Sequence, residues 1–142
     1  MAKIALTWLV AILLIGCAYN VPSTTTVYAK EPIIKVELSI DEMITKYAME
    51  FGVSEKTMKD VMDCENVAHD PTLQSGLHYT KDHPEWGVKK GDRELSFGLV
   101  QIHLPSHPSV SYEEATNSDY SIRFLARGLS EGRGSQWSCF RD

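Results

Sequence analysis

Residues 58–65, which read Met-Lys-Asp-Val-Met-Asp-Cys-Glu, decide the fold prediction. The apolar side chains Met58, Val61 and Met62 recur at the spacing of one helix face, so we expect this face to contact the core. Glu65 lies on the same face, at the expected C-terminal end of the helix. Burial and the helix dipole both disfavour a negative charge there and raise the pKa of a carboxyl group. A carboxyl group in such a place suits a general acid.

A structural role for Glu65 is the alternative interpretation. The carboxylate can pair with an arginine such as Arg123 or Arg127, or turn to solvent where the helix ends. Structural ion pairs also shift pKa values. From this helix face alone we favour the structural interpretation, and the chemical one needs further evidence.

Helix signals also surround this stretch. Residues 39–52 are expected to form a helix, because Ser39 and Glu42 have capping-box spacing and Gly52 suits the C-terminal stop. Ser54 can cap the helix that follows. The apolar face of the first helix consists of Ile40, Met43, Ile44, Tyr47, Ala48 and Phe51.

The pattern changes after residue 76. Strands are expected at residues 77–80 and 95–102, joined irregularly through a stretch that contains proline and glycine. A loop over residues 104–110 leads to a short helix that begins near Ser111 and a long one that begins at residues 117–118. The order helix, helix, small hairpin, helix, helix predicts an α+β domain that is mainly α.

The first residues resemble an export leader. In residues 1–29, Lys3 precedes an uncharged apolar run over residues 4–18, and Val-Tyr-Ala at residues 27–29 has the spacing of a signal-peptidase site. Leu-Ile-Gly-Cys, which ends at Cys17, resembles a bacterial lipobox and offers lipidation as the alternative. Export is expected in both cases, to the cell envelope or the extracellular space.

Composition and charge indicate one globular domain. The chain has 142 residues, of which 43% are hydrophobic and 23% charged, and its net charge is -5. It contains no long basic run, so we do not expect a nucleic-acid partner. Residues 30–38 are expected to form a linker. Besides Cys17, the chain holds Cys64 and Cys139, which in an exported protein predict a disulfide; two unrelated thiols are the alternative.

Four short motifs occur in a suggestive order. Glu65-Asn66 ends a helix, Asp70-Pro71 follows, Ser-Phe-Gly-Leu-Val-Gln-Ile occupies residues 96–102, and Phe-Leu-Ala lies at residues 124–126. In this order they resemble the lysozyme-like domain of the soluble lytic transglycosylases and goose-type lysozymes. The resemblance covers about residues 39–142 and implies a lysozyme-like fold with a small β-hairpin.

The resemblance implies a role for each matching residue. Glu65 would be the general acid that protonates the glycosidic oxygen and later the base. Asn66 stands where the family usually has serine and can still hydrogen-bond. Gln101 would bind the sugar or its N-acetyl group, and Gly98 would let the backbone approach the saccharide. Ser96 would orient Glu65.

The expected product depends on a second carboxylate. Gly91-Asp92-Arg93 ahead of residues 97–99 looks more like the goose-type lysozymes, which makes Asp92 a candidate, although a turn residue is equally consistent. A glycoside hydrolase normally needs two carboxylates, whereas a lytic transglycosylase needs one. Since only Glu65 is placed on an inward face, we favour the transglycosylase with 1,6-anhydro products. A lysozyme that uses Asp92 and a catalytically silent glycan-binding module are the alternatives.

The resemblance also implies the partners. The substrate would be peptidoglycan glycan strands, cleaved at the β-1,4 bond between N-acetylmuramic acid and N-acetylglucosamine without a cofactor. We expect a monomer that meets a membrane only through the leader or a lipid anchor at Cys17. His103 and His107 are four apart, but Pro105 prevents a continuous helix, so no metal site is expected. A metal-dependent peptidase is the rival that would use them.

Overall fold

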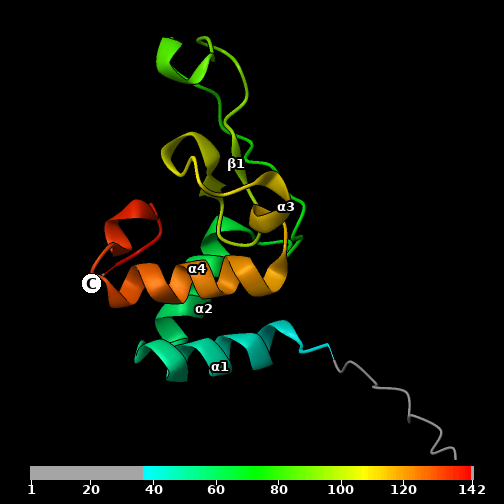
Figure 1. Ribbon diagram of the computed structural model, residues 1–142, viewed down its shortest axis with the longest axis vertical. Coiled ribbons are helices and arrows are strands. Elements are labelled where there is room, and N and C mark those ends of the chain that lie inside the picture. Colours follow the sequence, from blue (N-terminus) through cyan, green and yellow to red (C-terminus); the bar gives the residue numbers. More distant parts are fainter. Residues whose placement is uncertain (1–36, 142) are drawn as a thin grey trace, which may run out of the picture. The chain divides into compact units, whose positions relative to one another are not determined.

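The computed structural model describes residues 37–141. The predicted leader and most of the predicted linker lie outside the described residues. The elements in order are α1 (Ile40–Phe51), α2 (Glu55–Glu65), η1 (Pro84–Trp86), β1 (Ser96–Phe97), β2 (Ile102–His103), η2 (Leu104–Ser106), α3 (Tyr112–Ala115), α4 (Ser118–Ser130) and η3 (Gly134–Gln136). The predicted α+β domain, mainly α, is confirmed (Figure 1). None of the helices in this part of the chain has both the length and the apolarity needed to cross a membrane.

The predicted helix ends of the first half are confirmed. Ser39 and Glu42 form a reciprocal capping box at the start of α1, and Gly52 ends it in the left-handed conformation at φ 67°. The Ser54 side chain accepts a hydrogen bond from Thr57 N and begins α2. The two helices are thus separated by a tight corner that the sequence specifies locally.

The core lies where these helices meet the hairpin and α4. α1 packs against both α2 and α4 (Figure 1). Met58, Val61 and Met62 are fully buried, as their spacing predicts. The other large apolar side chains with almost no exposure are Ile44, Leu99, Val100, Ile102, Ile122 and Leu125. α2 therefore has its apolar face in the core and its last residue at the edge of it.

The hairpin differs from the prediction. Residues 95–102 do not form one strand, because β1 pairs antiparallel with β2, with Phe97 opposite Ile102. Residues 98–101 make the turn between them, since Gly98 at φ 87° and Gln101 at φ 50° reverse the chain. The expected second strand is therefore itself a small hairpin.

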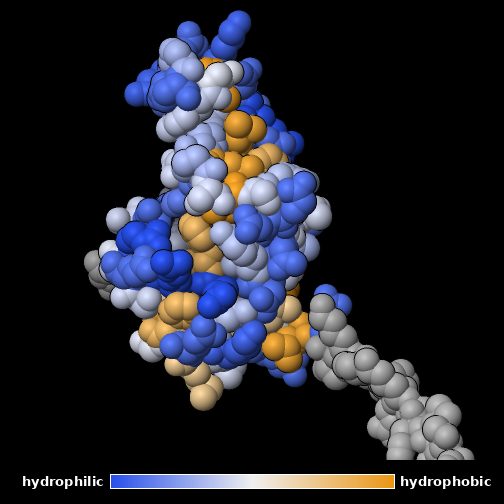
Figure 2. Space-filling view, viewed as in Figure 1, coloured by the Kyte–Doolittle hydropathy of each residue, from blue (hydrophilic) through white to orange (hydrophobic). Residues whose placement is uncertain are grey.

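Residues 77–94, which we call the arm, are not a regular strand pair. Only isolated bridges join its two sides, such as His78 with Arg93. Tyr79 nevertheless exchanges backbone hydrogen bonds with the returning chain, through Asp92 O and Gly91 N, both at 2.9 Å. Figure 1 shows the arm extending away from the helices. On the face in Figure 2, a narrow hydrophobic strip runs from the helical part toward the arm between hydrophilic sides.

Candidate active site

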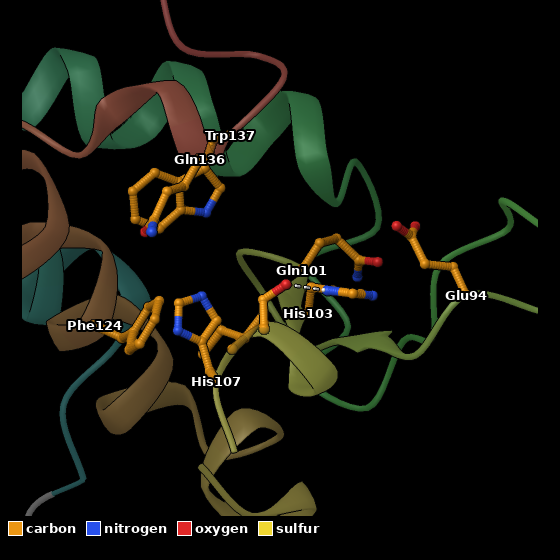
Figure 3. Close-up of a pocket in the computed structure, with 9 residues that line it drawn as sticks. Glu94, Gln101, His103, His107, Phe124, Gln136 and Trp137 are labelled. Carbon is orange, nitrogen blue, oxygen red and sulfur yellow. Dashed lines mark hydrogen bonds between the residues drawn. The ribbon is translucent and has the colours of Figure 1, made fainter. Parts of the chain in front are cut away.

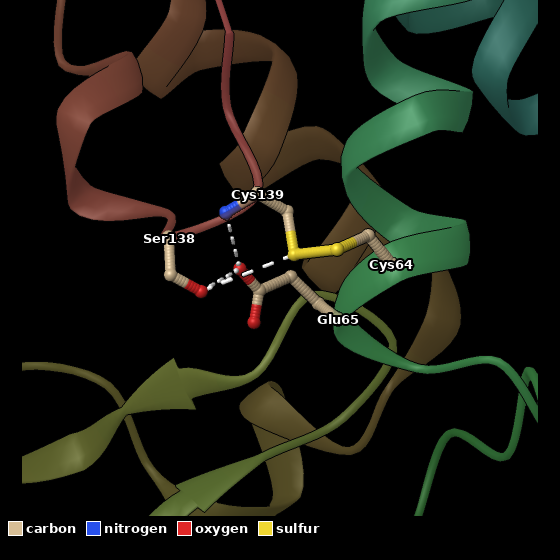
Figure 4. Close-up of a disulfide and its surroundings, with 4 residues drawn as sticks. All are labelled: Cys64, Glu65, Ser138 and Cys139. Carbon is tan, nitrogen blue, oxygen red and sulfur yellow. Dashed lines mark hydrogen bonds between the residues drawn. A yellow bond between two sulfur atoms is a disulfide. The ribbon is translucent and has the colours of Figure 1, made fainter.

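Glu65 is the last residue of α2 and is half-buried. Its Oε1 accepts a hydrogen bond from Ser138 Oγ at 3.1 Å and from the backbone N–H of Cys139 at 3.3 Å. Figure 4 shows its second carboxylate oxygen pointing away from the C-terminal segment. Within residues 37–141 that oxygen, Oε2, accepts no hydrogen bond. The carboxyl group is therefore held at one oxygen and open at the other.

The two arginines considered as partners of Glu65 pair elsewhere. Arg123 contacts Glu50 at 3.5 Å and Arg127 contacts Glu131 at 2.9 Å. In the part of the chain that the structure describes, Glu65 forms no ion pair. The ion-pair interpretation of Glu65 therefore does not hold within these residues.

Glu65 opens into a cleft of about 430 Å³. The cleft walls come from the end of α2, the loop after it, the two ends of the arm, the hairpin and the C-terminal segment, and they include Glu65, Leu77, Glu94, Ser96, Gln101 and Ser138. A second hollow, of about 320 Å³, adjoins it and shares Glu94, Gln101 and His103 as lining residues (Figure 3). Of the predicted site residues, the structure brings Glu65, Ser96 and Gln101 together in one cleft.

The side chain of Gln101 is fixed through its amide nitrogen, which leaves its amide oxygen available to a ligand. Its Nε2 donates to Leu73 O at 3.2 Å and to Gly98 O at 2.9 Å. Its Oε1 accepts no hydrogen bond within residues 37–141, and Figure 3 shows this oxygen on the side of Glu94. A fixed amide oxygen in a cleft can accept a hydrogen bond from a hydroxyl or an N–H group of a ligand.

The serine that hydrogen-bonds to Glu65 is not Ser96. Ser96 is buried and lines the cleft, but its side chain does not bond to Glu65. Ser138 donates to Glu65 instead. The sequence contained a signal for this residue: Ser138 precedes Cys139, and the predicted partner of Cys139 is Cys64, the neighbour of Glu65.

Asn66 and Gly98 lie outside the cleft lining. Asn66 is 1% exposed, and its Nδ2 donates to Asp70 O at 2.7 Å and to Gly98 O at 3.1 Å, while its Oδ1 accepts from Asp70 N at 3.2 Å. An added Cβ at Gly98 would meet Ala115 O at 1.9 Å. Close packing of the hairpin turn against α3, rather than approach to a ligand, requires glycine at this position.

The second carboxylate of the cleft is Glu94 rather than Asp92. Asp92 lies in the arm, outside the cleft lining, and its Oδ2 accepts from Lys89 N at 2.8 Å, as a turn residue does. Glu94 is half-buried, lines the cleft, and accepts from Ser75 Oγ at 2.9 Å. Asp92 and Glu94 both precede Ser96 at even spacing, which places them on the same face of an extended chain, so the sequence spacing alone does not separate them.

His103 connects the cleft to the arm. Its Nε2 lies 2.9 Å from Tyr79 Oη, its Nδ1 lies 2.7 Å from Ser106 Oγ, and Trp86 contacts its ring edge-on. Burial lowers the pKa of His103 below its ordinary value. Both ring nitrogens are engaged within the protein, so His103 orders the base of the arm. Among residues 37–141, no three His, Cys, Asp or Glu side chains gather as a metal site requires.

The predicted disulfide is confirmed. Cys64 and Cys139 are bonded, with Cα atoms 5.9 Å apart (Figure 4). The bond joins α2, one residue before Glu65, to the C-terminal segment.

No protein-family model, curated protein or solved structure matches this chain. The groups that the cleft offers for chemistry are one carboxyl group with an open oxygen, a second carboxylate, and a fixed amide.

Proposed function

We propose that the domain cleaves the β-1,4 bond between N-acetylmuramic acid and N-acetylglucosamine in peptidoglycan, with Glu65 as general acid and then general base. The observation that supports this most is that Glu65 opens into the same cleft as the amide oxygen of Gln101. The substrate class rests on the resemblance of the sequence motifs. The disulfide is compatible with an exported protein, and an exported protein can reach a cell-wall substrate.

The arrangement of Glu65 suits proton transfer. With two donors on Oε1, the proton of the neutral acid belongs on Oε2, which is free to give it to the bridging glycosidic oxygen. The bond from that oxygen to the anomeric carbon then breaks, and positive charge develops on the sugar ring. The amide of Gln101 would fix the ring during this step.

In the transglycosylase reaction the sugar itself completes the cycle. The C6 hydroxyl of the muramic acid residue attacks the anomeric carbon, and its proton returns to Glu65. No water is consumed, and the product carries a 1,6-anhydro ring. Only one carboxyl group is needed, which is why we favour this reaction.

Hydrolysis is the second candidate, because Glu94 lines the same cleft. A second carboxylate can activate water or act as a nucleophile. The product would then carry a new reducing end in place of the anhydro ring. The earlier candidate, Asp92, lies outside the cleft lining and gives this reaction no support.

Mass spectrometry of the fragments released from purified cell wall tests the proposal. The unaltered protein should release soluble muropeptides, mainly with 1,6-anhydro ends. Glu65→Gln should lower the rate at least ~100-fold, because glutamine keeps the shape but cannot supply the proton. Its melting temperature should be equal or higher, since its amide oxygen can accept the same two hydrogen bonds without a charge at the helix C-terminus.

The matched control is Asp63→Asn, which removes an exposed carboxylate two residues earlier on α2. It should leave the rate unchanged. If Glu65→Gln cleaves at a near-normal rate, the assignment of Glu65 fails. If the unaltered protein co-sediments with cell wall but releases nothing, the silent binding module replaces the enzyme.

A further inference from the structure

The C-terminal segment from Gly134 to Arg141 contacts the candidate acid at two adjacent points. Ser138 Oγ donates to Glu65 Oε1 at 3.1 Å, across 73 residues of sequence. The next residue, Cys139, donates its backbone N–H to the same oxygen and carries the disulfide to Cys64. Two consecutive residues of α2 are thus bound by two consecutive residues of the C-terminal segment (Figure 4).

The segment is also fixed on the other side of Ser138. Trp137 is 5% exposed, and its Nε1 donates to Val100 O at 2.9 Å in the core. Its ring fills the space over Gly128, where an added Cβ would lie 2.5 Å from the indole. Ser138 therefore lies between a buried indole and a covalent bond. Its own side chain is exposed, and besides Glu65 its Oγ contacts only the neighbouring Cys139 Sγ within the described residues, at 3.9 Å.

We propose that Ser138 is a positioning residue for Glu65, and that Trp137 and the Cys64–Cys139 disulfide hold it in place. This rests on the proposed function of Glu65. Ser138 and the N–H of Cys139 occupy Oε1 and so direct the transferable proton to Oε2, on the side of the carboxyl group away from the segment. The C-terminal segment thereby orients the carboxyl group of Glu65, in addition to packing against the core.

Ser138→Ala tests this with the full domain on a soluble glycan-strand fragment of peptidoglycan. Loss of one hydrogen bond to a charged group should lower kcat about 10-fold, with KM within about twofold, because the fault lies in the acid and not in binding. Ser138→Thr, which restores the hydroxyl, should recover most of kcat. The melting temperature of Ser138→Ala should change little, since the side chain is exposed.

Ser135→Ala is the matched control, since Ser135 is exposed and lies in the same segment, outside the cleft lining. It should leave kcat and KM unchanged. In the double variant Cys64→Ala/Cys139→Ala, assayed well below its melting temperature, kcat should also fall, because no covalent bond then holds Ser138 beside Glu65.

The outcomes separate this inference from the proposed function. If Glu65→Gln is inactive but Ser138→Ala keeps full kcat, the positioning role is overturned and the function stands. A Ser138→Ala effect confined to KM, or no recovery in Ser138→Thr, also overturns it. If Glu65→Gln remains active, the proposed function itself has failed.

Discussion

Asn66 donates a hydrogen bond from Nδ2 to the carbonyl oxygen of Gly98 at 3.1 Å, deep in the protein. Asn66 directly follows Glu65, and Gly98 begins the turn of the hairpin that presents Gln101. This bond therefore fixes the end of α2 relative to the hairpin. The two sides of the cleft owe their alignment to a buried amide that does not itself line the cleft.

Asn66→Ala should destabilise the domain strongly. The change removes three hydrogen bonds made by a side chain that is 1% exposed, so we expect a loss of about 2–4 kcal/mol in the free energy of unfolding. Urea denaturation followed by circular dichroism measures it. Val67→Ala in the same loop is the control and should change stability by less than about 0.5 kcal/mol, because Val67 is 84% exposed. Equal stability of the two variants would contradict the bracing role of Asn66.

Gly98→Ala should cost more than the same change at Gly91. Both glycines have positive φ, 87° and 92°, so alanine pays a left-handed conformational cost of about 1–2 kcal/mol at each. Only at Gly98 does the new Cβ also meet backbone, namely Ala115 O at 1.9 Å, whereas Gly91 has open space. We expect an extra loss of about 1–3 kcal/mol at Gly98. Similar melting temperatures for the two variants would show that the hairpin turn can move away from α3.

Removal of the disulfide should lower stability without abolishing the fold. Cys64 and Cys139 are 75 residues apart, so the chain-entropy model gives a contribution of about 4 kcal/mol. Cys64→Ala/Cys139→Ala should therefore denature at a markedly lower urea concentration than the oxidised protein. Thiol alkylation under native, oxidising conditions should detect no reaction at either position. Two reactive thiols in the native protein would refute the bond.

The helices were predictable because their signals are local. Ser39, Gly52 and Ser54 act within one helical turn of their own position, so the sequence alone marks where α1 and α2 begin and end. The hairpin was not predictable in this way. Residues 95–102 have an apolar bias that resembles one strand, and the turn at Gly98 depends on Ala115 and Asn66, which are distant in sequence.

The residues of the site divide in the same way, into those that the local sequence indicates and those that depend on distant parts of the chain. The spacing of its helix face placed Glu65 on an inward side, whereas the motif resemblance suggested roles for Glu65 and Gln101, and both residues line the cleft. Ser138 was missed, although the predicted disulfide already placed its neighbour beside Glu65. Glu94 and Asp92 were indistinguishable in sequence, because the aim of each side chain depends on how the arm returns to β1.

Stability should fall in mildly acidic solution because of two half-buried histidines. Burial lowers the pKa of His103 and of His107 below the ordinary value of 6.5, so the unfolded chain binds protons more tightly than the native one. Their contribution is complete above pH 6.5 and is lost as the pH falls below it. The melting temperature should be lower at about pH 5 than at about pH 7.5. Both pH values lie above the range where most carboxylates titrate.

The variant His107→Phe should reduce this difference in melting temperature. His107 contacts Phe124 edge-on, so an aromatic ring keeps the packing and removes the titration. Thermal scans of both proteins at the two pH values measure the effect. An unchanged pH dependence in the variant would show that His107 does not contribute.

The final prediction separates the two possible reactions through Glu94 and Asp92. If the sugar hydroxyl is the nucleophile, neither carboxylate is required. Asp92→Asn should then keep activity within about twofold, since Asp92 only accepts from Lys89 N in the arm. Glu94→Gln, whose amide can still bond Ser75 Oγ, should lower the rate less than ~10-fold, and 1,6-anhydro fragments should dominate the digest of both variants. If Glu94 activates water, Glu94→Gln should instead lose at least ~100-fold, and the unaltered protein should release reducing ends with oxygen from labelled water. We expect the first result, because the 1,6-anhydro reaction needs nothing more from the protein than a proton given and taken back, and Glu65 holds one oxygen fixed while the other opens into the cleft.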